Sequence, residues 1–255
     1  GPCVIESEDL CLHIAETVDW IALETGWQET AEPPPPPAAT RAFEVGQTVF
    51  EQGSASQWHA VSFDAPIENA VVVIGGIAGG GAQHFGLRIR EVTETGFEFQ
   101  LDEWDYLDGA HAEASISWMA GSAGDHLLGD GTIVHLGETA LDGAVRQRVD
   151  VAGLGEVSSV FATLAHGGAS ARTHRLLTDE TGFAFEVQGE EANGGSAAPK
   201  PGGTLAWAAI DTTGSSAAHG ALQLTHERAA LGLDAAPGAA LFAEMQTRAG
   251  ADPAT

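Results

Sequence analysis

The chain has 255 residues, with 36 acidic side chains against 10 basic ones, and its formal net charge at pH 7 is -26. Nucleic-acid-binding proteins and polybasic membrane anchors need clusters of Lys and Arg, so the composition argues against both classes of partner. The hydrophobic fraction of 44% is nevertheless enough to build ordinary cores.

The N-terminal segment contains both cysteines of the chain, Cys3 and Cys11, eight positions apart. Four-ligand zinc sites need paired Cys or Cys/His clusters, so this spacing does not match a zinc site. The alternatives are a local disulfide and two buried thiols, and we favour the disulfide, which predicts an extracellular or cell-surface location. No apolar run approaches the roughly 18 residues of a membrane helix, so we expect no membrane insertion.

Residues 1–31 match the second half of a repeat that recurs later in the chain. Trp20 and Trp118 lie in similar short segments, and each follows a histidine by seven positions, His13 and His111 respectively. We therefore interpret residues 1–31 as the C-terminal half of one copy.

A linker is expected at residues 32–40. Residues 33–37 are all proline, and such a run favours polyproline II and acts as a semi-rigid spacer.

The first complete copy is predicted at residues 41–126. The run at 70–74 is continuously apolar, which suits a strand buried on both faces. Apolar and polar side chains alternate, as in half-buried strands, at residues 58–63, 87–92 and 96–101. Short strands with Gly, Asp, Asn and Ser between them predict a β-sandwich.

A second, divergent copy is predicted at residues 127–212. The Thr-Gly-Phe segment at Gly96 recurs 86 residues later at Gly182, and Trp118 has a counterpart in Trp207. The spacing of these matches defines the repeat length.

The final segment, residues 213–255, resembles the N-terminal half of a further copy. The two end fragments together lack a counterpart of residues 87–98, about one strand and a turn. Either the chain is part of a longer array, or its ends are completed by neighbouring copies of the same chain, as in donor-strand assembly.

The densest cluster of functional side chains lies at residues 102–113. Trp104 stands among carboxylates, and sugar sites use this combination because the ring covers an apolar sugar face and the carboxylates accept bonds from hydroxyls. The alternatives are a solvated acidic hairpin and an irregular calcium site at Asp102, Asp105 and Asp108, whose spacing does not match an EF-hand. No other metal or cofactor is expected.

Enzymatic motifs are absent from the sequence. The His-Glu pair at His226 lacks the second histidine of a zinc protease motif, because Ala230 occupies its position. No Gly-x-Ser-x-Gly segment occurs. We therefore expect no enzymatic activity and name no catalytic residue.

The segment 92–97, the position of Trp104 seven residues after Phe97, and the segment 116–120 around Trp118 resemble the H-type lectin domain of snail agglutinins and discoidin-like proteins. The resemblance is best over residues 58–120 and weaker over 147–210. It implies an all-β fold of tandem antiparallel six-stranded β-sandwiches. The family assembles as trimers and binds galactose or N-acetylgalactosamine.

The family's sugar site uses an Arg on the strand before the Gly-Phe turn and a Trp-His pair after it. Trp104 matches the Trp position, but Asp105 replaces the His. Arg88 is the nearest candidate for the Arg, with Arg90 as an alternative. In the second copy the Trp position holds Glu190, so the aromatic platform is not kept there.

Two functions follow from these observations. The first is an extracellular structural or adhesive protein that assembles head-to-tail into a filament through its incomplete ends. The second is a lectin module that binds galactose-type sugars through Arg88, Trp104 and Asp105.

Overall fold

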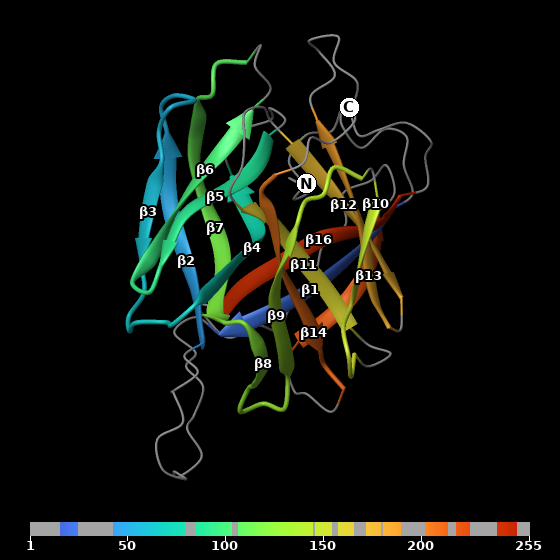
Figure 1. Cartoon of the computed structure of the whole chain (residues 1–255). Coiled ribbons are helices and arrows are strands. Elements are labelled where there is room, and N and C mark those ends of the chain that lie inside the picture. The colour runs from blue at the N-terminus through green and yellow to red at the C-terminus, as the bar shows by residue number, and fades with distance from the viewer. Residues whose placement is uncertain are drawn as a thin grey trace.

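The structure, a computed structural model, describes residues 16–24, 43–79, 85–103, 107–144, 146–154, 158–165, 172–179, 181–189, 202–213, 218–224 and 239–248. These residues form sixteen β-strands in curled sheets and include no helix (Figure 1), which confirms the predicted all-β class. Over the same residues, nothing has the length and apolarity of a membrane-spanning helix. Cys3 and Cys11 lie outside the described residues.

The strands fall into three groups, which we call units. The first unit contains β2 (Phe43–Gln52), β3 (His59–Ser62), β4 (Ala70–Gly79), β5 (Phe85–Thr93), β6 (Gly96–Glu103) and β7 (His111–Ser122). The second contains β8 (Gly124–Leu127), β9 (Ile133–Ala140), β10 (Arg146–Asp150), β11 (Ser158–Ala165), β12 (Arg172–Asp179), β13 (Gly182–Gly189) and β14 (Thr204–Asp211). The third contains β15 (Ala218–Leu224), β16 (Ala239–Arg248) and β1 (Glu16–Glu24).

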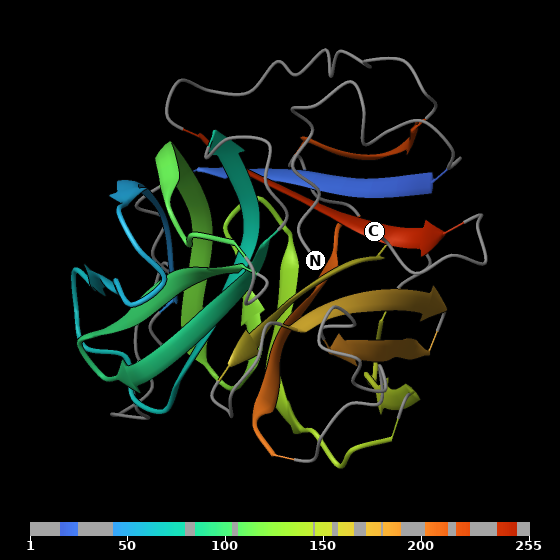
Figure 2. The ribbon, with the colours of Figure 1, turned by 90° about the horizontal axis from the view of Figure 1, so that it is seen from above.

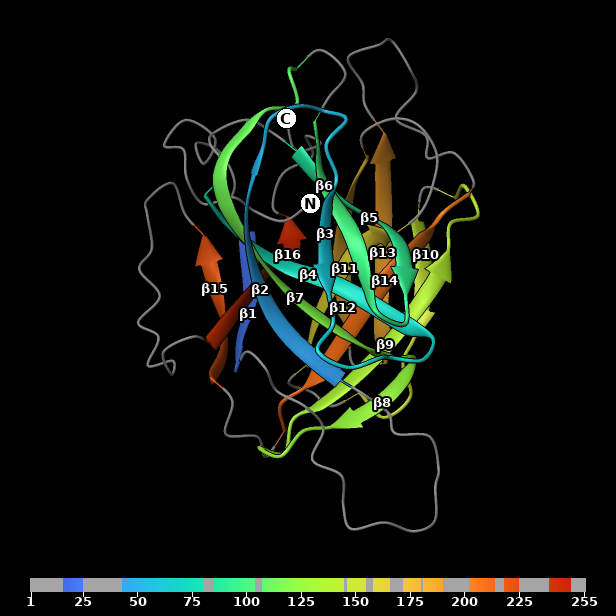
Figure 3. The same cartoon turned by 90° about the vertical axis from the view of Figure 1, so that its left-hand side faces the viewer.

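The three units share one antiparallel strand arrangement. Its order is β2-β7-β4 in the first unit, β9-β14-β11 in the second and β15-β1-β16 in the third. The first two units add a second set of strands, β3-β6-β5 and β10-β13-β12, and Figure 3 shows the set β3, β6 and β5 side by side. A short parallel contact between β5 and β11 joins strands of the first and second units into one seven-stranded sheet.

A tryptophan on the central strand of each unit lies opposite a glycine of the neighbouring strand. The pairs are Gly46 with Trp118, Gly137 with Trp207 and Gly220 with Trp20. A Cβ atom at Gly46 would overlap the Trp118 ring, and one at Gly137 would overlap the Trp207 ring. The indole therefore occupies the space that a side chain on the neighbouring strand would need.

The same tryptophans connect the two layers of strands. Trp118 meets the edge of Phe97 on β6, with ring centroids 5.6 Å apart, and its Nε1 donates a hydrogen bond to Thr48 Oγ1 at 3.1 Å. The second unit has matching contacts from Trp207 to Phe183, at 5.6 Å, and to Thr139, at 3.1 Å. The hydrophobic cores of both units thus lie between their layers.

The glycine of each repeated Gly-Phe segment is required by a close approach of two backbones. A Cβ at Gly96 would collide with the carbonyl oxygen of Val61, and one at Gly182 with that of Val149. This contact explains why the turn motif recurs in both units.

The two ends of the chain meet in the third unit. Strand β1 is antiparallel to both β15 and β16, with Trp20 opposite Gly220 on one side and Ala243 on the other. The two end segments were expected either to belong to a longer array or to be completed by neighbouring chains, and in the structure β1 pairs with β15 and β16 of the same chain. Strand β16 packs against β4, β11 and β12 of the first two units, and β1 and β15 lie successively further out (Figure 2).

Strands β4, β11 and β16 meet in the middle of the molecule. Phe161 and Phe242 are fully buried there, with ring centroids 5.8 Å apart. Both rings lie against Gly75, where a side chain would have no space. The backbone N–H of Ile74 donates to Thr163 Oγ1 at 2.8 Å, and that hydroxyl donates to the Ile74 carbonyl at 3.0 Å. The three units therefore pack around one shared interior, and each unit contributes different residues to it.

Candidate functional site

The candidate loop connects β6 to β7 in the first unit. Its two ends, up to Glu103 and from Leu107 onward, are described, whereas Trp104 and Asp105 lie outside the described residues. The structure therefore describes the residues that flank this loop.

Arg88, the predicted arginine, lies on β5 and forms an ion pair with Asp102 at the end of β6. Its side chain is 16% exposed, and its backbone is in register with Leu164 of β11 at the boundary between the first and second units. The structure thus brings Arg88 next to the strand end from which Trp104 follows.

Arg90, the alternative arginine, lies two residues further along β5. Its Nε donates to Glu98 at 2.6 Å, and its guanidinium carbon lies 3.9 Å from the ring centroid of Trp58. This cation–π contact makes Trp58 an aromatic residue of the same sheet face. Trp58 was not predicted as a site residue, because it lies about thirty positions from either arginine and only the sheet brings them together.

A buried pair of ionisable side chains lies at the end of β6 and the start of β7. His111 Nε2 is 3.2 Å from Glu103 Oε1, and the two side chains are 0% and 2% exposed. The other carboxylate oxygen of Glu103 accepts the backbone N–H of Gly109 at 2.6 Å. The His111 ring also meets the edge of Phe85, at 5.0 Å between centroids.

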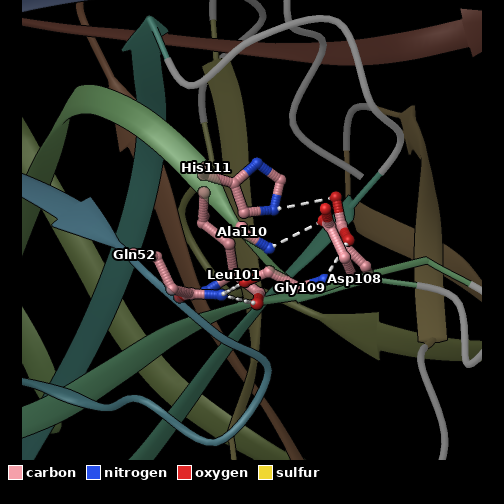
Figure 4. A network of polar contacts seen from close by, with 7 residues as sticks. Gln52, Leu101, Asp108, Gly109, Ala110 and His111 are labelled. Carbon is pink, nitrogen blue, oxygen red and sulfur yellow. Dashed lines mark hydrogen bonds and ion pairs between the residues drawn. The ribbon is translucent and has the colours of Figure 1, made fainter.

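Gln52, on β2, links the same two chain segments. Its Nε2 donates to the carbonyl of Leu101 at 2.7 Å and to that of Gly109 at 3.0 Å, and its Oε1 accepts the N–H of Leu101 at 2.9 Å. Figure 4 shows Gln52 directed at both backbones, with His111 and Asp108 on the other side of Gly109. The amide therefore connects β6 to the return of the loop.

Burial raises the pKa of Glu103 above its ordinary value. The hydrogen bond from Gly109 and the nearby His111 oppose this rise, while Asp108 adds to it. The proton affinity of the Glu103 carboxylate is thus set mainly by its removal from solvent.

The segment 53–57 is attached to the outward face of β6. Gln100 Nε2 donates to the carbonyls of Ala55, at 2.5 Å, and Gln57, at 3.0 Å. A Cβ at Gly109 would collide with Ala55, so this segment also touches the return of the candidate loop.

Glu103 and Gln52 were not selected from the sequence. A signal for Glu103 exists, because the alternation that buries Phe97, Phe99 and Leu101 continues to position 103. Gln52 has no comparable signal, since its function depends on two segments about 50 residues away in the sequence.

The second unit differs at the corresponding positions. Register places Gly189 at the position of Glu103, so the buried carboxylate has no counterpart there. The arginine position, by contrast, is kept.

Arg175 of β12 is opposite Glu186, as Arg88 is opposite Gln100. Gln100 and Glu186 each lie three residues after the Phe of the Gly-Phe turn. Sequence spacing misses this match because β5 has a register shift between Arg90 and Thr93 that adds one residue.

The calcium alternative has little geometric support. In the described ranges, no group of three or more His, Cys, Asp or Glu side chains is arranged to hold a metal ion. Asp102 pairs with Arg88, and Asp108 Oδ1 accepts the N–H of Ala110 at 3.0 Å. Asp105, the third candidate ligand, lies outside the described residues.

Comparison with known proteins gives no match, whether to family models, to curated proteins or to solved structures.

Proposed function

We propose that the chain is an extracellular adhesive protein whose first unit binds sugars of the galactose or N-acetylgalactosamine type. The observation that carries this proposal is the Arg88–Asp102 ion pair directly before the loop that contains Trp104 and Asp105. Sugar hydroxyls bond to charged groups of this kind, and an aromatic ring covers the apolar face of the sugar.

We further infer that the first two units are six-stranded antiparallel β-sandwiches of the H-type lectin kind. The first has three strands in each layer, and the second has the same two sets of three with β8 added at the edge beside β9; both have a Trp–Phe contact between layers. The three units also surround a shared interior in one chain, which parallels the trimers of that family.

In the proposed site, Arg88 donates hydrogen bonds to sugar hydroxyls, Asp105 accepts them and Trp104 covers the ring. A shallow platform with one aromatic residue yields about 4 kcal/mol, which corresponds to a millimolar dissociation constant. The site therefore suits multivalent contact with a glycan-coated surface.

Saturation-transfer NMR with galactose and N-acetylgalactosamine tests the proposal. We expect transfer to the sugar in the wild-type chain and none in Trp104→Ala. Trp58→Ala is the matched control, because it removes an aromatic ring that Arg90 already covers. Equal transfer in the wild type and Trp104→Ala would rule this site out.

A second candidate, a structural protein that forms filaments, is favoured by the construction of the third unit from both chain ends. The same strand pairs can form between β1 of one chain and β15 and β16 of the next, a head-to-tail contact. Assembly then strengthens with salt or calcium, which screen the charge of -26 per chain.

Light scattering on the full chain and on a chain without residues 1–30 tests this candidate. We expect the full chain to polymerise and the truncated chain to remain monomeric. Monomers of both at every salt and calcium concentration would exclude the filament.

A further inference from the structure

We propose that the chain has an acceptor edge for an extended, basic segment of a partner protein, which adds to β4 as a parallel strand. The acceptor edge consists of Ile77 and Ala78 of β4 together with Leu241 and Ala243 of β16. This inference depends neither on sugar binding nor on the exchange of β1 between chains.

A strand occupies the corresponding edge in the second unit. Leu164 and Ala165 of β11 are in parallel register with Arg88 and Ile89 of β5, a strand of the first unit. Both β11 residues are buried, at 7% and 1% exposed. The edge of β11 is thus closed by a second-layer strand of the unit before it.

The first unit has the same edge in β4, which pairs with β7 alone among the described strands. Opposite the position two residues before the unit's central tryptophan, β11 has Leu164 and β4 has Ile77. Ile77 is therefore the counterpart of Leu164, and Ala78 is the counterpart of Ala165. In contrast to these buried counterparts, Ile77 is half-buried and Ala78 is exposed.

The sheet β15-β1-β16 is less covered on the face that the other two units bury under a second layer. The residue opposite the central tryptophan is Ile74 in the first unit and Ala162 in the second, and both are buried. Its counterpart in the third unit, Ala243, is half-buried, as is Leu241, the next residue on the same face. The open edge of β4 is therefore accompanied by a partly open sheet face.

The edge and the face adjoin each other. A Cβ atom at Gly76, the residue before Ile77, would collide with the carbonyl oxygen of Leu241. A strand along Ile77 and Ala78 would therefore also run over β16, as β5 runs between β11 and β4. Strand β4 consists only of Ala, Val, Ile and Gly, so it has none of the charged side chains that keep strand edges from pairing.

The strands in the equivalent places define the chemistry of the partner segment. Strand β12 lies beside β16 as β5 lies beside β11, and each of the two has two arginines, out of 10 basic side chains in the chain. In β5, Leu87 and Ile89 are buried and alternate with Arg88 and Arg90. A basic segment is also attracted to a chain with a net charge of -26. In strand addition of this kind, main-chain hydrogen bonds give affinity and the alternate side chains give specificity.

The sequence of the third unit contains no such strand. Its two fragments lack a counterpart of residues 87–98, which include most of β5. We therefore assign the position beside β4 to a segment from outside residues 1–255.

The test uses a fluorescently labelled peptide with the sequence of β5, Phe85–Thr93. Its matched control has serine in place of Leu87 and Ile89, which keeps the length and the charge. Fluorescence anisotropy measures the binding of each peptide to the full-length chain, and hydrogen–deuterium exchange locates the bound peptide.

Two variants of the full-length chain complete the test. Leu241→Glu places a carboxylate on the face that the peptide would cover. Leu127→Glu is the control, because it adds the same charge at a position of β8 that is 62% exposed, at the far edge of the seven-stranded sheet. Circular dichroism shows whether each variant folds; if Leu241→Glu does not, the two peptides on the wild-type chain decide the question.

We expect the β5 peptide to bind the wild type and Leu127→Glu equally, and to bind Leu241→Glu about tenfold more weakly, because the added carboxylate would be buried without a partner. Exchange should slow at residues 76–79, and the serine peptide should not bind.

Three results would overturn the inference. The first is no binding of the β5 peptide, and the second is equal binding of the serine peptide, which would show attraction by charge alone. The third is an equal loss of binding in Leu241→Glu and Leu127→Glu, or slower exchange at Leu164 and Ala165 in place of residues 76–79, which would show that the peptide replaces β5.

Discussion

The first and second units have the same scaffold but differ at one end of it. Both pack a tryptophan over a glycine, bond its indole N–H to a threonine and place a glycine at the turn before β6 or β13. Only the first has Gln52, Glu103 and His111, at the end of the unit where Trp104 follows.

This difference separates the residues that both units use from those that only the first unit has. The shared residues fill the core or accept hydrogen bonds from buried donors, and both units need these contacts to fold. The residues found only in the first unit tie a loop to its strands. Four predictions sharpen or break this division, beginning with the largest expected effect.

Gly46→Ala and Gly137→Ala should destabilise the protein most, each by about 3 kcal/mol, because the added methyl group overlaps a buried indole. Urea unfolding monitored by circular dichroism measures the loss. Gly53→Ala is the control, since its Cβ would meet only Gln57 Oε1 at 3.4 Å. If Gly46→Ala and Gly53→Ala unfold at the same urea concentration, the indole packing is not a shared requirement.

Thr48→Val and Thr139→Val should each cost about 1 kcal/mol, because the indole N–H of Trp118 or Trp207 loses its acceptor. The two losses should be similar, as expected for one repeated contact. Thermal unfolding of both variants measures them. A loss in one unit only would show that the same hydrogen bond stabilises the two units to different extents.

His59→Gln should make the free energy of unfolding fall less steeply as the pH decreases. Burial lowers the pKa of His59, so the folded chain takes up this proton at lower pH than the unfolded chain. The stabilisation by neutral His59 is full above its ordinary value of 6.5 and falls as pH decreases through it. Gln147 lies at the matching position in the second unit. The variant therefore gives the first unit the residue type that the second unit has there.

Unfolding free energies of the wild type and His59→Gln, measured from pH 7.5 to 5, provide the comparison. Parallel curves would contradict the expected contribution of His59.

Glu103→Gln should change the free energy of unfolding least. The pH dependence that Glu103 contributes should be opposite in sign to that of His59. The raised pKa means that the folded chain keeps this proton to a higher pH than the unfolded chain. The associated stabilisation is full below the ordinary value of 4.5 and is lost as pH rises through the folded pKa. Glutamine does not titrate, so the slope in this window should decrease.

Urea titrations between pH 4 and 7 measure that slope, with Glu113→Gln as the control for a lost surface charge. A decrease of equal size in both variants would assign the effect to net charge.

Parts of the fold and of the site were predictable because their signals are local. The alternation around Phe97 and Phe99 predicted strands, and the repeated Gly-Phe segment predicted two related copies; the all-β class is confirmed. Arg88 was selected by a family resemblance and lies beside the loop. Arg175 was missed because one extra residue in β5 changes the spacing.

The sequence by itself determined the strand class, the repeated motifs and the net negative charge, because alternation, motif spacing and composition need no knowledge of distant partners. Only the tertiary structure decided that β1 lies between β15 and β16 of its own chain, and that Glu103 is buried against His111. Strand pairing and burial depend on contacts between segments far apart in the chain. Several pairings satisfy the same hydrophobic pattern until packing around Phe161, Phe242 and Gly75 selects one.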